Sequence, residues 1–142
     1  MAFSTSTSLL HRLHRASQIA TERFASELGD ADLTPCQIIV LAAIAADEGA
    51  SQTTIVEATG VDRSTLTDIV KRLLRRGLLS RRRTKEDARA YALKLTEAGR
   101  RALESAVPVM ARVEAEMLTA IPAKQRAELI NLLGTLTERE KT

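Results

Sequence analysis

The spacing of apolar residues changes at Gly77, and this change constrains the fold more than any other feature of the chain. Before Gly77 the spacing is helical, in a stripe made of Leu66, Ile69, Val70, Leu73 and Leu74. After it, "LLSRRR" and "YALKLT" alternate like two short strands, and "TKEDARA" between them is typical of a hairpin loop. The sequence therefore predicts a helix that leads directly into a two-stranded hairpin.

Two short helices are predicted before the hairpin. Ser51 caps the first, "SQTTIVEATG", which ends at Gly60, and Asp62 caps the second, "DRSTLTDIVKRLLRRG", which ends at Gly77. Because only residues 59–61 separate them, the pair is typical of a helix-turn-helix. A helix-turn-helix followed by such a hairpin is a winged helix. We therefore expect a mainly α fold with a small β-hairpin wing.

The residues before this unit predict two further helices. The first covers residues 8–28 at helical apolar spacing and ends at a glycine. The second has a well-specified start, because Thr34 can cap it, Pro35 suits its first position and Gln37 completes a capping box. Its body, "QIIVLAAIAA", is apolar nearly all round and closes near Gly49, which predicts a central buried helix.

The carboxyl-terminal third predicts two more helices, the first starting at Thr96. Pro108 should kink that helix, and Pro122 should begin the last one. The apolar stripes of these helices have no obvious core of their own, so we expect them to be buried in a second copy of the chain. The expected division of this single domain is a DNA-binding winged helix-turn-helix lobe over residues 33–95 and a helical dimerisation region over residues 1–30 and 96–142.

Charge is distributed unevenly along the chain. The net charge is +3, but residues 62–89 hold ten Lys or Arg against four Asp or Glu, a balance of +6, and the rest hold eleven against fourteen, a balance of −3. Such a local positive segment indicates a surface that binds a polyanion, although a charged face that is only solvated is the alternative. The sequence has no apolar run that would span a membrane and no export signal, so we expect a soluble, cytoplasmic protein without a membrane partner.

The exposed side of the second short helix fits DNA. Short hydroxyl groups near its amino end can approach base edges, and basic groups further along can meet phosphates in a major groove. The polar residues on this side are Ser64, Thr65, Thr67, Asp68, Lys71, Arg72 and Arg75. The alternative is that the hydroxyl groups only cap or solvate the helix. In the hairpin, Lys85 and Arg89 can reach a minor groove, and Asp87 either holds an arginine in one rotamer or only forms the turn.

The chain resembles the MarR family of bacterial transcription regulators over almost its whole length. The residues that carry the resemblance are "LTPCQIIVLAAI", "DRSTLTDIVKRLLRRGLLSRRR", "DARAYALKLTEAGR" and the terminal pair of helices. The resemblance implies a winged-helix homodimer that binds a two-fold pseudo-palindromic operator and is often released by a small ligand. It also implies base reading by Ser64, Thr65, Thr67, Asp68 and Lys71, with Arg63 beside them, backbone contacts by Gln52, Thr53, Arg72 and Arg75, and a wing that includes Arg89. Asp68 departs from the basic residue often found near that position in the family.

An effector site is the least constrained prediction. His11, His14 and Arg15 cluster on the first helix and could receive a carboxylate, a phenol or the phosphates of an acyl-coenzyme A, or they could only tie two subunits together. Cys36, the single cysteine, lies in a first helical turn that can activate a thiol, and a reactive thiol there would make the protein a redox-sensing regulator. The other interpretation of Cys36 is a small buried hydrophobic side chain. We expect a structural Cys36 and a repressor that a small organic ligand releases.

Two other classes of protein are alternatives to a DNA-binding regulator. No histidine, serine or cysteine stands in a nucleophile elbow, a phosphate-binding loop or a metal-ligand spacing, so we expect neither an enzyme nor a cofactor or metal site. A winged helix that binds protein instead of DNA is the second alternative. The excess of arginine in the second short helix and the hairpin argues against it.

Overall fold

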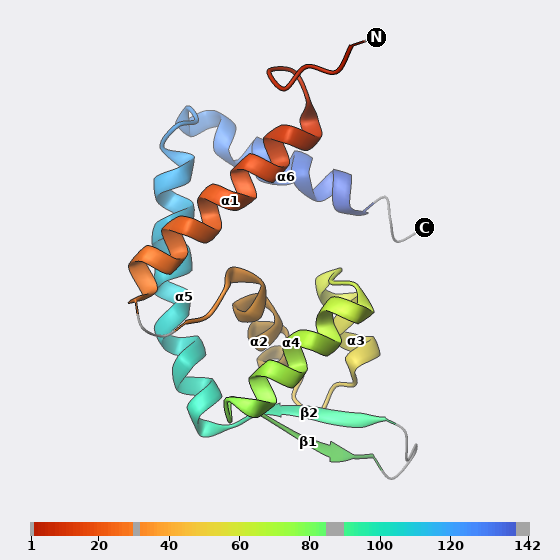
Figure 1. Ribbon diagram of the computed structural model, residues 1–142. Coiled ribbons are helices and arrows are strands. Elements are labelled where there is room, and N and C mark those ends of the chain that lie inside the picture. Colours follow the sequence, from red (N-terminus) through yellow and green to blue (C-terminus); the bar gives the residue numbers. More distant parts are fainter. Residues whose placement is uncertain (1, 30–31, 85–89, 139–142) are drawn as a thin grey trace.

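The computed structural model describes residues 2–29, 32–84 and 90–138 (Figure 1). Within these residues the hairpin lies at one end of the molecule, and α6 lies with the start of α1 at the other. The expected mainly α fold with a hairpin wing is confirmed. The elements are α1 (Leu9–Leu28), α2 (Pro35–Ala46), α3 (Gln52–Thr59), α4 (Arg63–Arg75), β1 (Leu79–Arg83), β2 (Tyr91–Leu95), α5 (Glu97–Leu118) and α6 (Ala123–Glu138).

Side-chain caps begin five of the helices where the sequence predicts them. Each cap oxygen accepts a hydrogen bond from a backbone amide three residues later, and the cap residues are Ser8, Thr34, Ser51, Asp62 and Thr96. α2 ends earlier than predicted, at Ala46, and Gly49 belongs to the turn that follows, where its φ angle of 92° suits glycine. Gly77 closes α4 as predicted, because the amides of Gly77 and Leu78 donate hydrogen bonds to the carbonyls of its last turn and Gly77 has a φ angle of 70°.

The hydrophobic core lies around α2. Apolar side chains from α2, α3, α4 and both strands are buried together, and the fully buried ones there are Val40, Leu41, Ile44, Ile55, Leu66, Leu73 and Leu93. In α4 the buried residues recur at helical spacing, so the opposite side of that helix stays outside the core. α1 contributes one buried residue to this core, Phe24, and α6 contributes none.

The hairpin is attached to the core along β2. β1 and β2 pair antiparallel, with Leu79 opposite Leu95 and Arg83 opposite Tyr91. Backbone hydrogen bonds also join Leu93 to the loop after α2, from the Gly49 amide to the Leu93 carbonyl (2.8 Å) and from the Leu93 amide to the Ala50 carbonyl (2.9 Å). The base of the wing is therefore held on two sides, by β1 and by this loop.

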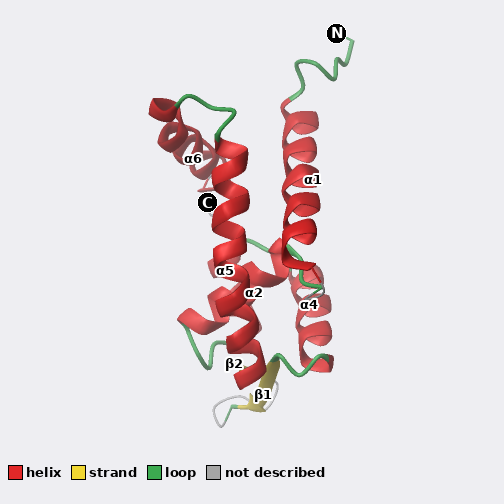
Figure 2. Ribbon diagram, turned by 90° about the vertical axis from the view of Figure 1, so that its left-hand side faces the viewer, coloured by secondary structure: helices red, strands yellow, loops and turns green. Residues whose placement is uncertain are grey.

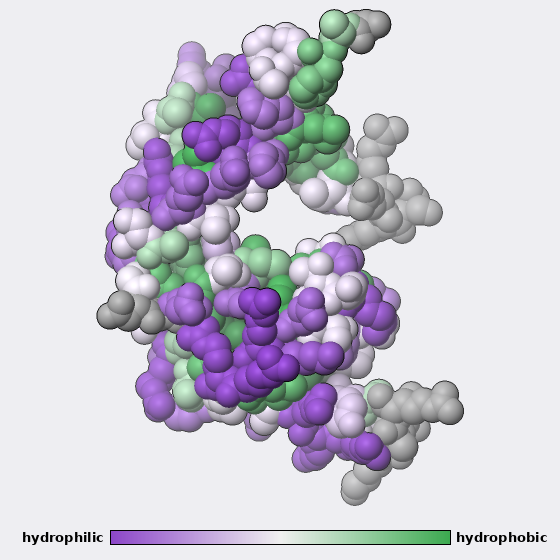
Figure 3. All heavy atoms as spheres, viewed as in Figure 1, coloured by the Kyte–Doolittle hydropathy of each residue, from purple (hydrophilic) through white to green (hydrophobic). Residues whose placement is uncertain are grey.

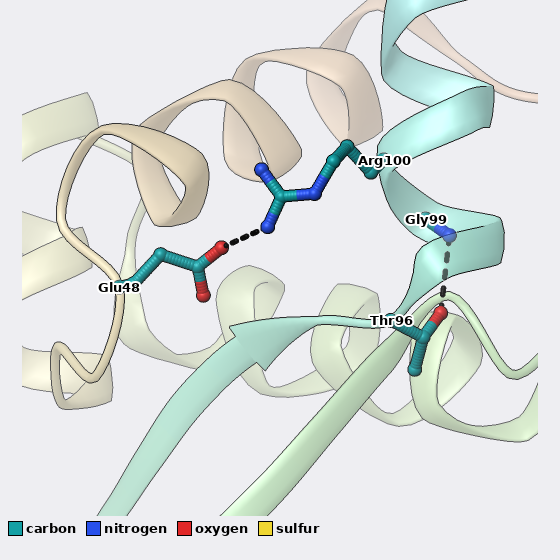
Figure 4. A network of polar contacts seen from close by, with 4 residues as sticks. All are labelled: Glu48, Thr96, Gly99 and Arg100. Carbon is teal, nitrogen blue, oxygen red and sulfur yellow. Dashed lines mark hydrogen bonds and ion pairs between the residues drawn. The ribbon is translucent and has the colours of Figure 1, made fainter.

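The start of α5 is attached to the turn before β1 and to the loop after α2. Figure 4 shows the contacts of Thr96 with Gly99 and of Arg100 with Glu48. Thr96 accepts a hydrogen bond from the Gly99 amide and donates one to the Gly77 carbonyl. A Cβ atom at position 99 would overlap the Leu78 carbonyl oxygen, so only glycine allows this approach. One residue on, Arg100 pairs with Glu48 after α2 at 2.9 Å. The segment "TEAGR" thus fixes the angle between α5 and the winged region.

The helical ends form a second, more open region. α1 and α5 lie side by side, joined by an ion pair of 3.2 Å between Glu27 and Arg112, and α6 turns back from the far end of α5 (Figure 2). Pro108 lies inside α5, which continues through it, and Pro122 directly precedes α6 as predicted. No helix in the described part of the chain is long and apolar enough to cross a membrane.

Candidate nucleic-acid interface

α4 presents a polar side to solvent while its apolar side is held in the core. Leu66, Ile69, Val70 and Leu73 anchor it. Six of the seven polar residues singled out from the sequence are exposed, and they are Ser64, Thr65, Asp68, Lys71, Arg72 and Arg75. In Figure 3 hydrophilic residues cover the front of the lower half of the molecule, where α4 lies. A rigid helix with a free polar side is the form in which proteins read the major groove.

The first turn of α4 is organised around Asp62. Hydrogen bonds from the hydroxyl and the amide of Thr65 stabilise the negative charge of the Asp62 carboxyl and lower its pKa. A negative charge at a helix amino end is stabilised by the helix dipole. The Thr65 hydroxyl therefore has a capping partner in the free protein. This contact is the structural role that is the alternative to base reading.

Two side-chain hydrogen bonds join α3 to α4. The Gln52 amide donates to the Thr67 hydroxyl (3.3 Å), and the Arg63 guanidinium donates to the Thr53 hydroxyl (2.7 Å). Thr67 itself donates to the Arg63 carbonyl at 2.8 Å, so its hydroxyl is engaged both as donor and as acceptor. Unlike its neighbours, Thr67 is half-buried. These bonds orient α4 and occupy Thr67 and Arg63, and Thr65 is engaged with Asp62. The exposed groups of α4 that remain for a partner are Ser64, Asp68, Lys71, Arg72 and Arg75.

The hairpin adds basic side chains beyond those predicted. Arg81, Arg82 and Arg83 on β1 and Lys94 on β2 are exposed. Alternation along the strands places Arg81, Arg83 and Tyr91 on one side and Arg82 and Lys94 on the other. The predicted wing residues Lys85, Asp87 and Arg89 lie outside the described residues. The strand arginines were missed as site residues, although the run of three charged side chains in "LLSRRR" is typical of an exposed strand.

An apolar cavity of about 590 Å³ opens between α1, α5 and α6. Its lining contains two charged residues, Arg12 and Glu114, and is otherwise apolar: Leu9, Leu13, Ala16, Met117, Leu118, Ile121, Leu129, Ile130 and Leu133. Figure 3 shows apolar residues gathered at the upper right, near the start of α1. This cavity lies at the far end of the molecule from the hairpin.

The predicted effector residues are not brought into one cavity. His14 lines a shallow hollow with Ser17, Gln18, Thr21 and Glu22, of which Cys36 is not a part. A ring nitrogen of His11 lies 3.0 Å from the Thr5 carbonyl oxygen, and Arg15 is exposed.

Cys36 packs against the core at the start of α2. Burial, and secondarily the charge of Asp62, raise the pKa of the Cys36 thiol, which opposes activation. No cluster of potential metal ligands occurs in the ranges that the structure describes.

Comparison with curated proteins identifies transcription regulators. The chain is 32% identical to the transcriptional regulator HosA of Escherichia coli O157:H7, over 87% of this chain and 90% of that protein. It is 28% identical to the transcriptional repressor NicR of Pseudomonas putida, over 92% of this chain and 83% of that protein.

Solved structures give the same result. The PcaV transcriptional regulator of Streptomyces coelicolor, in complex with its natural ligand, matches with a TM-score of 0.87 and 30% identity, over 97% of both chains. The transcriptional repressor CouR, bound to a 23-mer DNA duplex, matches with a TM-score of 0.81 and 30% identity, over 96% of this chain and 99% of that one.

The family model for the MarR family matches residues 31–90, which contain α2, α3, α4 and β1 and end directly before β2. Proteins of this family are DNA-binding regulators of transcription and not enzymes. The fold, the free polar side of α4 and these similarities agree, and the chain belongs to the MarR family of transcriptional regulators.

Proposed function

We propose that this regulator is a homodimer that represses transcription by binding a pseudo-palindromic operator, with one α4 in each of two major grooves. The observation that carries the proposal is the exposed polar side of α4, fixed on a packed core beside a basic hairpin. A two-fold symmetric dimer binds two DNA half-sites that are related by the same two-fold axis, so a dimer of this chain implies a pseudo-palindromic operator. Because its partner is chromosomal DNA, we place the protein in the cytoplasm.

The side chains of α4 divide by position. Ser64, Asp68 and Lys71 have no partner within the described residues that would compete with a base edge, so they are the best candidates for base reading. Asp68 can accept a hydrogen bond from a cytosine amino group. Thr65 and Thr67 have structural partners, and they contribute to reading only if those bonds rearrange on binding.

The backbone contacts come from two groups of residues. Arg72 and Arg75 lie further along α4, where a phosphate can meet them. Gln52, Thr53 and Arg63 position α4 and lie near the backbone, and the wing, with Lys85, Asp87 and Arg89, flanks it. Phosphate contacts supply affinity that does not depend on sequence, whereas base contacts supply the preference.

The dimer is supported by the apolar surface of the helical ends. α6 has no buried residue in the single chain, and its Ile130, Leu132, Leu133 and Leu136 are all exposed. An apolar surface of this kind, continuous with the start of α1, is typical of an interface between copies of one chain. The family is typically dimeric.

A small organic ligand is the proposed signal for release. PcaV was solved with its natural ligand, CouR was solved with p-coumaroyl-CoA, and 6-hydroxynicotinic acid regulates DNA binding by BpsR of Bordetella bronchiseptica. By analogy we propose an aromatic, phenolic, carboxylate or acyl-CoA ligand for this chain, with His11, His14 and Arg15 as candidate contacts. Oxidation of Cys36 is the less favoured signal, because the raised pKa of its thiol keeps it protonated.

Binding to promoter and random duplexes at several salt concentrations tests the proposal. Replacing Arg72 by Ala should weaken binding to all DNA and reduce the slope of log K against log salt by about 0.9. Replacing Lys71 by Ala should instead relax the preference at one base pair, by about 1–3 kcal/mol. Lys124→Ala on α6 removes a similar charge away from α4 and is the control. A wild-type protein that binds promoter DNA no better than random DNA would refute sequence-specific binding.

A further inference from the structure

Tyr91 contacts two arginines of the wing at once. The Arg81 guanidinium carbon lies 4.6 Å from the centre of the Tyr91 ring, and that of Arg83 lies 5.7 Å from it. Nε of Arg83 also donates a hydrogen bond of 3.4 Å to the Tyr91 hydroxyl. The strand register explains the arrangement, because Tyr91 lies directly opposite Arg83 and diagonal to Arg81 on the same side of the hairpin.

This side of the hairpin is the outward continuation of the core side. Leu79, Leu93 and Leu95 occupy it at the base and are buried, and the register then places Arg81, Arg83 and Tyr91 further out, where both arginines are exposed. Neither arginine forms an ion pair with a carboxylate among the described residues. Two guanidinium groups therefore share one aromatic ring and have no acidic partner in the ranges that the structure describes.

Without the ring this pair of arginines would be poorly arranged for binding an anion. Two like charges two residues apart repel each other, and each free arginine side chain must lose rotamer freedom when it meets a phosphate. Stacking on a phenol ring offsets the repulsion and limits the rotamers in advance. A guanidinium that stacks by its flat side keeps its N–H edge available for two hydrogen bonds to a phosphate.

We propose that Tyr91 is a positioning residue for DNA binding, which holds Arg81 and Arg83 ready to contact the phosphates beside the site read by α4. This inference rests on the proposed DNA-binding function and deepens it. Tyr91 acts through the two arginines and does not itself need to touch DNA. The alternative role for Tyr91 is only to stabilise the hairpin as a cross-strand partner of Arg83.

A double-mutant cycle separates the two roles. Tyr91→Leu keeps an apolar side chain but removes the ring, and it should weaken binding to operator and random duplexes by the same factor, about three- to tenfold. The salt slope should stay close to that of the wild type, because both arginines still reach phosphates. Arg81→Ala combined with Arg83→Ala should reduce the slope by about 1.8, and adding Tyr91→Leu to this pair should change nothing further.

Two matched variants control the cycle. Tyr91→Phe keeps the ring and should retain most of the wild-type affinity. Arg82→Ala removes a neighbouring charge on the other side of β1, so its effect should add to that of Tyr91→Leu without coupling. Thermal unfolding by circular dichroism should show similar midpoints for all variants, since a hairpin that melts would lower affinity for a different reason.

The ring also provides a direct signal in the free protein. Tyr91 is the only tyrosine and the chain has no tryptophan, so ultraviolet absorbance reports the ionisation of this one phenol. The hydrogen bond and charge of Arg83, and then the charge of Arg81, lower the pKa of Tyr91. Replacing Arg83 by Ala should raise that pKa toward its ordinary value, and an unchanged titration would overturn the contact on which the proposal depends.

Each result on DNA has a definite meaning. Three outcomes would each overturn the positioning role alone. The first is wild-type affinity in Tyr91→Leu, and the second is an equal loss of affinity when Tyr91→Leu is added to the double arginine variant. The third is a loss of affinity in Tyr91→Phe as large as that in Tyr91→Leu. A wild-type protein that binds no duplex would refute the proposed function, and this role with it.

Discussion

The winged region (residues 33–95) and the helical ends (α1, the outer half of α5, and α6) bury their apolar side chains in different ways. In the winged region Val40, Leu41, Ile44, Ile55, Leu66 and Leu73 are all fully buried within the single chain. In the helical ends, seven leucines and isoleucines of α1 and α6 remain 39–76% exposed, and α6 buries none of its residues. The first region has a complete core, whereas the second has a surface that lacks a partner.

The difference shows how the two functions are divided along the chain. A helix that reads DNA must be held rigidly, and the closed core around α2 provides this for α4. An association surface must stay open in one chain so that another copy can close it. The join between them is α5, whose first turn is locked to the winged region by Thr96, Gly99 and Arg100.

The largest expected effect concerns the open surface. Replacing Ile130 and Leu133 by Glu places four charges in a two-fold interface and should weaken the dimer by about 5 kcal/mol or more, because each lost apolar side chain contributes about 1.5–3 kcal/mol. Sedimentation and urea unfolding at several protein concentrations measure the loss.

The matched control lies in the winged region. Ile39 on α2 is 45% exposed, and Ile39→Glu should leave the dimer intact. A wild-type protein that is a folded monomer at micromolar concentration would contradict the comparison itself, because the open surface would then need no partner.

The next effect concerns the join. Gly99→Ala forces a methyl group against the Leu78 carbonyl and should cost about 3 kcal/mol or more of folding free energy, even though alanine favours helices. Gly134→Ala in α6 is the control, since nothing lies within 4 Å of an added methyl group there in the single chain. It should stabilise by up to about 1 kcal/mol. Equal stability of Gly99→Ala and the wild type would show that α5 is less tightly attached than the structure indicates.

Local signals in the sequence predicted most of the fold. The caps at Thr34, Ser51, Asp62 and Thr96 are short-range features, and each helix starts where its cap predicted. The end of α2 at Ala46 was placed too late, because Gly49 serves the next turn and not the helix itself, whereas Gly77 closes α4 as predicted. Gly99 carried no recognisable signal, since the approach of Leu78 that requires it is a tertiary contact.

The candidate site was only partly predictable for a similar reason. The exposed polar side of α4 follows from helical spacing, and it was found. The contacts from Gln52 to Thr67 and from Tyr91 to Arg81 and Arg83 depend on how two elements lie against each other. The position of the effector residues relative to one another also depends on tertiary structure. They were grouped by sequence spacing, and in the single chain they do not line one cavity.

A small effect is expected for the ion pair across the join. Arg100 and Glu48 lie 2.9 Å apart, but their side chains are 48% and 28% exposed, so water screens the pair. A double-mutant cycle with Arg100→Ala and Glu48→Ala should give a coupling of about 0.5 kcal/mol, reduced further by salt. A coupling above about 2 kcal/mol would mean that the join depends on this pair more than on the packing at Gly99.

The smallest effect is expected at Cys36, where the closed region protects a thiol. Burial raises its pKa, so at neutral pH the native thiolate fraction should be below the few per cent of a free cysteine. Labelling by a thiol reagent should therefore be slower in the native than in the unfolded protein, and the native rate should keep rising to higher pH before it levels off. Operator binding by the wild type and by Cys36→Ser should be alike before and after mild peroxide. A loss in the wild type alone, reversed by a thiol reductant, would show that the partly buried thiol of Cys36 reacts in spite of its raised pKa and acts as a redox switch.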